Sequence, residues 1–172
     1  MIAAAIEFVL SNFTLTFLVI GLVVSLVAIS RAPKPLGAAV VVEKLMAWYV
    51  FFPIGVSFLY NFVMHCFFGE MAARFIGWAN SPFQFEVGTA SLGFAVVAFV
   101  AAFASFDLRL AAILGPSIFT LGAAAGHVYQ MVTAHNFAPG NAGVIFWTDI
   151  LIPLFGFVLL ALQWRLGKPV RP

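Results

Sequence analysis

Charged residues are scarce in this chain of 172 residues. Asp, Glu, Lys and Arg make up 8% of the sequence and hydrophobic residues 64%, whereas a soluble globular domain carries about 25% charged residues. A chain this short cannot cover its surface with so few polar groups, so most of that surface must face lipid. The few basic residues form no stripe or cluster, which argues against a nucleic-acid partner.

Cysteine pairs and catalytic motifs are also missing. Cys66 is the only cysteine, which excludes an intrachain disulfide and a cysteine metal cluster. The sequence contains no phosphate-binding glycine loop, no Gly-x-Ser-x-Gly elbow and no internal repeat. No basic residues precede the first apolar segment, whose first charge is Glu7, so we expect a retained helix and not a cleaved signal peptide. The length favours a single domain over residues 1–172, and these absences favour a role other than catalysis.

Five apolar segments are long enough to cross a bilayer, which takes about 20 helical residues. They cover residues 6–30, 43–69, 81–105, 108–134 and 143–164. Turn residues such as Pro139-Gly140-Asn141 separate them. The sequence therefore predicts an all-α integral membrane bundle with five transmembrane helices.

The basic residues predict the orientation of this bundle, because Lys and Arg accumulate on the cytoplasmic side. With the N-terminus outside and the C-terminus in the cytoplasm, Arg74 is the only basic residue on the outer side. The inner side then holds Arg31, Lys34, Lys44, Arg109, Arg165, Lys168 and Arg171. We expect a multi-pass protein of the bacterial inner membrane with this orientation.

Prolines and small residues interrupt the apolar segments. Pro53, Pro116 and Pro153 each remove a backbone donor and favour a kink. Gly122 and Gly126 enclose three alanines, a pattern that lets another helix approach closely. Small residues beside a ligand pocket have the same pattern, so both interpretations stay open.

Four ionisable residues lie inside the last four predicted helices, one on each. They are His65, Glu86, His127 and Asp149. Such a group costs about 2.5–3.5 kcal/mol inside a membrane and usually faces the bundle interior. At 1.5 Å per residue, all four lie roughly 6–11 Å below the outer boundary.

Because they share one depth, these four side chains are predicted to meet in a polar pocket that opens to the outer side. Gln84, Gln130 and Asn141 are further candidates near the same level. The inner half of the bundle has no comparable residues in this interpretation. The structural alternatives are a His127–Asp149 pair that joins two helices and a Glu86 placed by the helix dipole.

Three chemistries fit the four residues. Two carboxylates and two imidazoles can relay protons. They can also bind a transition metal, with His65, His127, Glu86 and Asp149 as ligands, although no His-x-x-x-His spacing is present. Two histidines can instead hold a haem. The sequence requires none of these cofactors.

Two stretches carry a family resemblance. Residues 77–88 (GWANSPFQFEVG) and 137–143 (FAPGNAG), the latter followed by Trp147, Asp149 and Pro153, resemble a bacterial family of small polytopic membrane proteins of unknown function. Glu86-Val87-Gly88 is similar to a motif of DoxX-like proteins, some of which are subunits of membrane oxidoreductases.

The leading hypothesis is an inner-membrane protein whose outward-facing pocket binds a proton, cation or small polar ligand in transport or sensing. Five helices are few for a transporter built from repeats, so we expect a homo-oligomer or a larger complex. The alternatives are an accessory or assembly subunit with a structural polar cluster, and a redox protein that binds haem or quinone.

Overall fold

The computed structural model describes residues 1–167, and all regular structure in that range is helical. Lys168 and Arg171, which contribute to the predicted charge bias, lie outside the described residues. The elements are α1 (Ile2–Ser11), α2 (Phe13–Ser30), α3 (Ala38–Tyr49), a π-helical segment η1 (Val50–Val56), α4 (Ser57–Phe67), α5 (Gly69–Ile76), α6 (Phe83–Ala101), α7 (Phe106–Ala134), α8 (Pro139–Ala142) and α9 (Val144–Leu166).

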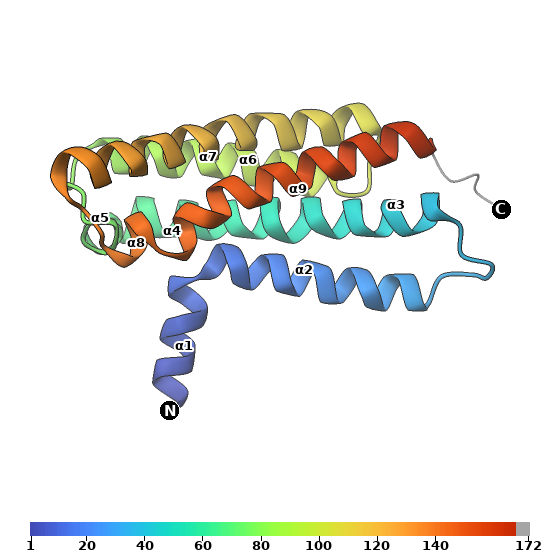
Figure 1. The fold of residues 1–172 in the computed structure, drawn as a ribbon, viewed down its shortest axis with the longest axis horizontal. Coiled ribbons are helices and arrows are strands. Elements are labelled where there is room, and N and C mark those ends of the chain that lie inside the picture. Colours follow the sequence, from blue (N-terminus) through green and yellow to red (C-terminus); the bar gives the residue numbers. More distant parts are fainter. Residues whose placement is uncertain (168–172) are drawn as a thin grey trace.

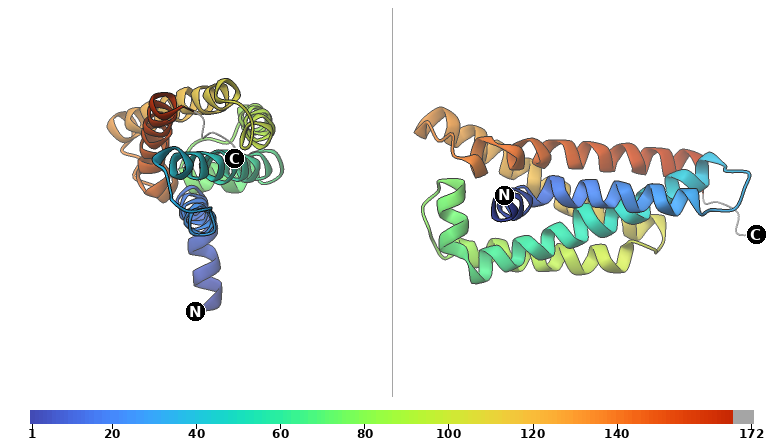
Figure 2. Two further views of the ribbon diagram at one scale, coloured as in Figure 1. Left: turned by 90° about the vertical axis from the view of Figure 1, so that its right-hand side faces the viewer. Right: turned by 90° about the horizontal axis from the view of Figure 1, so that it is seen from below.

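Five helices in this range are long and apolar enough to cross a membrane, which confirms the predicted number. They are Phe13–Ser30, Ala38–Phe67, Phe83–Ala101, Phe106–Ala134 and Pro139–Leu166. The last four start and end within five residues of the predicted segments. The five run side by side along one axis (Figures 1 and 2). Large apolar side chains such as Val100, Ile118 and Leu151 are more than half exposed on the outside, as contact with lipid requires.

The first predicted helix, 6–30, differs from the structure because the chain breaks at Asn12. The Asn12 side-chain amide donates to the carbonyl of Phe8 at 2.8 Å, and Thr16 donates to the carbonyl of Val9 at 3.0 Å. The Phe8 carbonyl also accepts from the backbone N–H of Asn12 at 3.1 Å, whereas the Val9 carbonyl accepts from the Thr16 side chain, so side chains stabilise the chain end where the backbone ladder stops. As a result α1 turns sharply away from the axis of α2 (Figure 1), and α2 alone provides about 27 Å of helix.

Proline has its clearest effect in the second span. Pro53 lies in the π-helical segment η1, where its missing amide is accommodated by the wider turn. Pro116 and Pro153 lie inside α7 and α9, both of which continue past them. Beside Pro153, the buried Tyr49 hydroxyl donates to the carbonyl of Ile152 at 2.7 Å.

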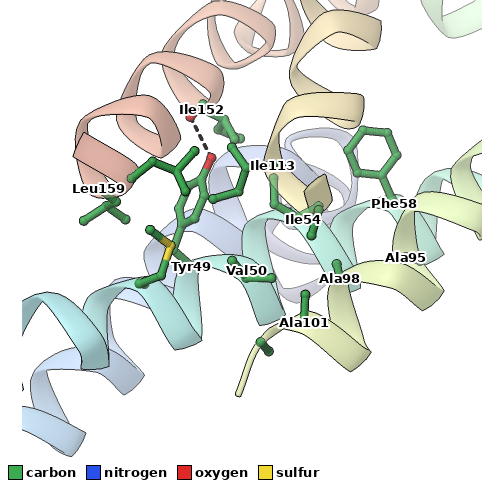
Figure 3. Close-up of a cluster of buried hydrophobic side chains, with 14 residues drawn as sticks. Tyr49, Val50, Ile54, Phe58, Ala95, Ala98, Ala101, Ile113, Ile152 and Leu159 are labelled. Atoms are coloured by element: carbon green, nitrogen blue, oxygen red, sulfur yellow. Dashed lines mark hydrogen bonds between the residues drawn. The ribbon is translucent and has the colours of Figure 1, made fainter. Parts of the chain in front are cut away.

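Buried hydrophobic side chains form one core cluster in the bundle (Figure 3). We call the end of the bundle where α2 ends and α3 begins the inner end, and the opposite end the outer end, after the orientation that the sequence predicts. Met46, Val50 and Ile113 are completely buried there. On α6 the buried positions carry small side chains, namely Ala95, Ala98 and Ala101, along with the adjoining Ala102. These small residues let α6 lie close to η1, which it contacts directly.

A buried ion pair joins four helices at the inner end. The Arg109 side chain is 1% exposed, and its two terminal nitrogens donate to the two carboxylate oxygens of Glu43, each at 2.7 Å. Arg109 also donates to the carbonyl of Ala102 at 2.9 Å, at the end of α6. Gln163 of α9 donates to Glu43 at 2.9 Å. Charge and hydrogen bonds are thus both satisfied for the guanidinium, as a buried charge requires.

The expectation that the inner half lacks polar contacts comparable to those of the outer half is therefore wrong. Glu43 begins the second predicted segment and Arg109 lies next to the start of the fourth, so both resemble boundary charges in the sequence. Their pairing depends on the packing of α3 against α9 and of α7 against α9, which the sequence pattern does not contain.

Replacing Arg109 by Met should lower the free energy of unfolding by about 1.5–3 kcal/mol, because it removes the charged hydrogen bonds to Glu43, whose side chain is 30% exposed and stays partly hydrated. Thermal unfolding of the purified protein in detergent measures this. The matched control is Arg74→Met, which removes the exposed pair between Arg74 and Glu70 at 2.5 Å and should cost less than about 1 kcal/mol. Equal losses for the two variants would contradict the structural role of Arg109.

Candidate functional site

The outer half of the bundle separates into two helix pairs. Helix α4 packs on α6 and α7 packs on α9. The first pair is close because Gly88 of α6 has no side chain: a Cβ there would lie 2.4 Å from Sγ of Cys66 on α4. Between the two pairs lies a cavity of about 1110 Å³.

The wall of this cavity is mostly apolar, whereas the sequence predicted a polar pocket. Side chains from both pairs and from α1, α2 and α5 form it, among them Leu10, Phe13, Phe58, Val63, Met64, Met71, Phe75, Phe119 and Ile145. Its polar side chains include Thr14, Asn61, His65, Gln84, Thr120, His127 and Asp149. A few polar groups in an apolar wall are typical of a site for a small molecule.

The completely buried Asn141 organises one side of the cavity. Its amide nitrogen donates to the carbonyls of His127 at 3.2 Å and Asn136 at 2.9 Å. Its amide oxygen accepts from Nε1 of Trp78 at 2.8 Å and lies 2.7 Å from Nδ1 of His127. Two carbonyls can only accept, so these contacts fix which end of the amide is the nitrogen.

The same contacts determine the tautomer of His127. Since the Asn141 oxygen can only accept, Nδ1 of His127 must carry a hydrogen. The other ring nitrogen, Nε2, lies 3.6 Å from Oδ2 of Asp149. A bare Nε2 would present its lone pair to a carboxylate, and this arrangement favours one proton on the pair, either on the imidazole or on the carboxyl group.

Asp149 has an unfilled capacity to accept hydrogen bonds. It is 8% exposed, and no group in residues 1–167 donates a hydrogen bond to its carboxylate. The 3.6 Å distance to His127 exceeds a normal hydrogen bond. Its neighbour Thr148 is by contrast fully engaged, with Oγ1 2.7 Å from Oγ1 of Thr14. Because Asp149 lines the cavity, a molecule there can reach its oxygens.

A second polar contact lies on the other helix pair. Nδ1 of His65 on α4 is hydrogen-bonded to Oε1 of Gln84 on α6, and both residues line the cavity. One turn earlier, Asn61 donates to Ser91 at 2.9 Å. His65 and Gln84 therefore face the same cavity as His127 and Asp149, from the opposite pair of helices.

The structure does not bring Glu86 or Gln130 into this site. Gln84 and Val87 of α6 line the cavity, while Glu86 is exposed, because two residues along a helix turn the side chain by about 200° from Gln84. Gln130 is half-buried and is not part of the cavity wall. A shared depth along the axis does not guarantee a shared face.

The four ionisable residues thus do not converge as a metal site would require. Among the described residues, no group of three or more His, Cys, Asp or Glu side chains is arranged to hold a metal ion. His127 and Asp149 are paired, His65 is on the opposite helix pair, and Glu86 points away.

The small residues of α7 line the cavity. Gly122, Ala123 and Gly126 are part of its wall, and a Cβ at Gly122 would meet no other atom within 4 Å. A Cβ at Gly126 would lie 3.3 Å from the ring of Trp78. Of the two open interpretations of this stretch, the structure favours the wall of a pocket over tight helix packing at Gly122.

These features mark the chain as a membrane protein built from an apolar helical bundle. Residues 11–169 match the family described as "Family of unknown function (DUF6790)", and the chain belongs to this family. The prediction of an uncharacterised family is confirmed. The match begins near the end of α1 and covers all five membrane-spanning helices. No curated protein and no solved structure matches the chain.

Replacing Asn141 by Ala should lower the free energy of unfolding by about 2 kcal/mol or more, because Trp78, His127 and two carbonyls lose a buried partner. Chemical unfolding in detergent, followed by circular dichroism, measures the change. The control is Asn80→Ala, since Asn80 is exposed and its loss should be within about 0.5 kcal/mol. If the two variants were equally stable, Asn141 would not organise this site.

Proposed function

We propose that the protein binds a proton, a cation or the hydrogen-bond donor of a small ligand at Asp149 and His127, in transport or sensing. The supporting observation is a carboxylate that lines a cavity, is nine-tenths buried and accepts no hydrogen bond within the described residues. Asn141 and Trp78 orient the imidazole, and His65 with Gln84 provides a second polar contact on the opposite wall.

The geometry favours binding over a purely structural pair. A pair that only joins α7 to α9 gains most when its atoms approach to about 2.7–2.9 Å, as Arg109 and Glu43 do. His127 and Asp149 stay 3.6 Å apart. A buried carboxylate with free acceptor capacity is costly unless it binds a proton or a partner, so an intramembrane carboxylate of this kind is a functional candidate.

We further propose that the chain lies in a bacterial inner membrane with its N-terminus outside and its C-terminus in the cytoplasm. Helix α2 ends, α3 begins and α9 ends at one end of the bundle (Figure 1). Among the described residues, Arg31, Lys34, Lys44, Arg109 and Arg165 lie in or next to the segments at this end. The cavity would then face the outer half of the membrane. A green fluorescent protein fused to the C-terminus should fluoresce, and a periplasmic phosphatase fused there should be inactive; the reverse result would contradict this orientation.

A second candidate is an accessory or assembly subunit of a larger membrane complex, or a homo-oligomer. Helix α1 favours it, because residues 1–10 are exposed and, apart from Glu7, apolar. The similarity of Glu86-Val87-Gly88 to DoxX-like proteins supports the same role. In that case the His127–Asp149 pair would be structural, and its replacement would affect stability alone.

Proton binding at the pair should change the fluorescence of Trp78, whose ring centroid is 5.4 Å from that of His127. In a protein with Trp48, Trp147 and Trp164 replaced by Phe, emission should fall as His127 becomes an imidazolium. His127→Gln should abolish this dependence on pH. Asp149→Asn should move its midpoint by about 1 pH unit or more, since an opposite charge at this range has such an effect.

The matched control is Glu86→Gln, which also converts a carboxylate into an amide but on the exposed face of α6. Its pH profile and melting temperature should equal those of the parent protein. If Asp149→Asn and Glu86→Gln gave the same profile, the proposed site would be wrong. If Asp149→Asn only lowered the melting temperature, the structural role would be favoured.

A further inference from the structure

The size and lining of the cavity restrict what can fill it. Its volume of about 1110 Å³ is slightly above the range of roughly 300–1,000 Å³ for small-molecule sites. Apolar cavities of about 150 Å³ stay dry and bind apolar ligands. Water is therefore a poor occupant of the part lined by Phe58, Phe75 and Phe119, and a small polar ion would leave that part empty.

The cavity also reaches the lipid-facing flank of the bundle, and the residues at this opening are apolar. Several side chains in its wall are themselves large, apolar and at least one-third exposed, namely Leu10, Val63, Phe68, Met71 and Phe83. On a helix bundle in a bilayer such residues contact hydrocarbon. The cavity is thus continuous with the surface that faces lipid, and an occupant can enter from the membrane.

Helix α1 lies beside this opening. Glu7, Leu10 and Ser11 are part of the cavity wall, and α1 runs across the axis of the bundle (Figures 1 and 2). Apart from Glu7, the residues of α1 before Ser11 are apolar, and a helix of this composition is stable in a membrane and not in water. In the proposed orientation, α1 lies in the plane of the outer leaflet and lines the route from lipid to Asp149.

We propose that the ligand is a membrane amphipath with a hydrocarbon chain and a head group that donates a hydrogen bond. The chain fills the apolar part of the cavity, and an ammonium or hydroxyl head group donates to Asp149. This inference rests on the proposed function, because it identifies the class of molecule that fills the site at Asp149.

Two carboxylates line the cavity, Glu7 and Asp149, and Asp149 gives the site its selectivity because it is 8% exposed, whereas Glu7 is exposed. A head group without an N–H or O–H would desolvate the carboxylate and leave it without a donor, which is more costly than forming no contact. Binding of a donor head group should therefore be about tenfold tighter than binding of the same chain with a methyl ester head. The ammonium and hydroxyl groups share this chemistry, and they occur in different lipids.

The test uses protein that retains Trp78 as its only tryptophan, in nanodiscs of phosphatidylcholine, whose head group has no N–H. The probes are 9,10-dibromostearyl amine, the corresponding alcohol, and methyl 9,10-dibromostearate. Bromine quenches tryptophan on contact, and Trp78 lines the cavity. The amine, the alcohol or both should quench at about tenfold lower concentration than the ester, and whichever does so identifies the head group.

Two pairs of variants locate the binding. Asp149→Asn should remove the tenfold preference, while Glu86→Gln should keep it. Gly122→Leu should prevent quenching by all three probes, because it adds a side chain inside the cavity where a Cβ meets no atom within 4 Å. The control Gly93→Leu also adds its side chain in open space, but outside the cavity wall, and should leave quenching unchanged.

The outcomes separate this inference from the proposed function. Ethylammonium has the same head group as the amine probe but no long chain. If it changed the pH dependence of Trp78 emission as strongly as the long-chain amine did, Asp149 would bind donors but the lipid inference would be wrong. If the ester bound as tightly as the amine and the alcohol, the lipid inference would also be wrong. If Asp149→Asn changed neither the pH response nor the preference, both proposals would be wrong.

Native mass spectrometry offers an independent comparison. It uses the protein with all four tryptophans, the same probes, and the Gly122→Leu and Gly93→Leu variants.

Discussion

The hydrogen bonds of one buried amide determine the chemistry of the outer half of this bundle. Asn141 bonds the carbonyls of His127 and Asn136 with its nitrogen, and Trp78 and His127 with its oxygen. It thereby holds the loop before α6, the end of α7 and the start of the last span together. Because its orientation is fixed, so is the tautomer of His127, and Nε2 is left facing Asp149 at 3.6 Å, an arrangement that favours one proton on the pair.

The two buried ionic groups differ in how completely their hydrogen bonds are satisfied. At the inner end, Arg109 forms two bonds to Glu43 and further bonds to the end of α6, so it stabilises a closed contact among helices. At the outer end, Asp149 lines a cavity and has acceptor capacity left over. The pair of Arg109 and Glu43 stabilises the packing of the helices, and Asp149 supports our proposal of a binding site.

Much of the fold follows from hydropathy, because each span must satisfy its backbone internally and present apolar side chains to lipid. Spacing along the sequence also identified His127 and Asp149 as residues at one depth. Depth alone placed Glu86 with them, but its direction from the α6 axis puts it on the exposed face. The break at Asn12 and the pairing of Glu43 with Arg109 depend on side-chain hydrogen bonds formed only after packing, so the apolar pattern could not reveal them.

The most direct test of this account is the protonation pattern of His127, measured by NMR on protein with ¹⁵N-labelled histidine and assigned with His127→Gln. The account predicts that Nδ1 carries a hydrogen at every pH at which the protein is folded, and that only Nε2 gains or loses one. A neutral His127 with hydrogen on Nε2 and a bare Nδ1 would contradict the role of Asn141. It would also remove the argument for a proton shared with Asp149.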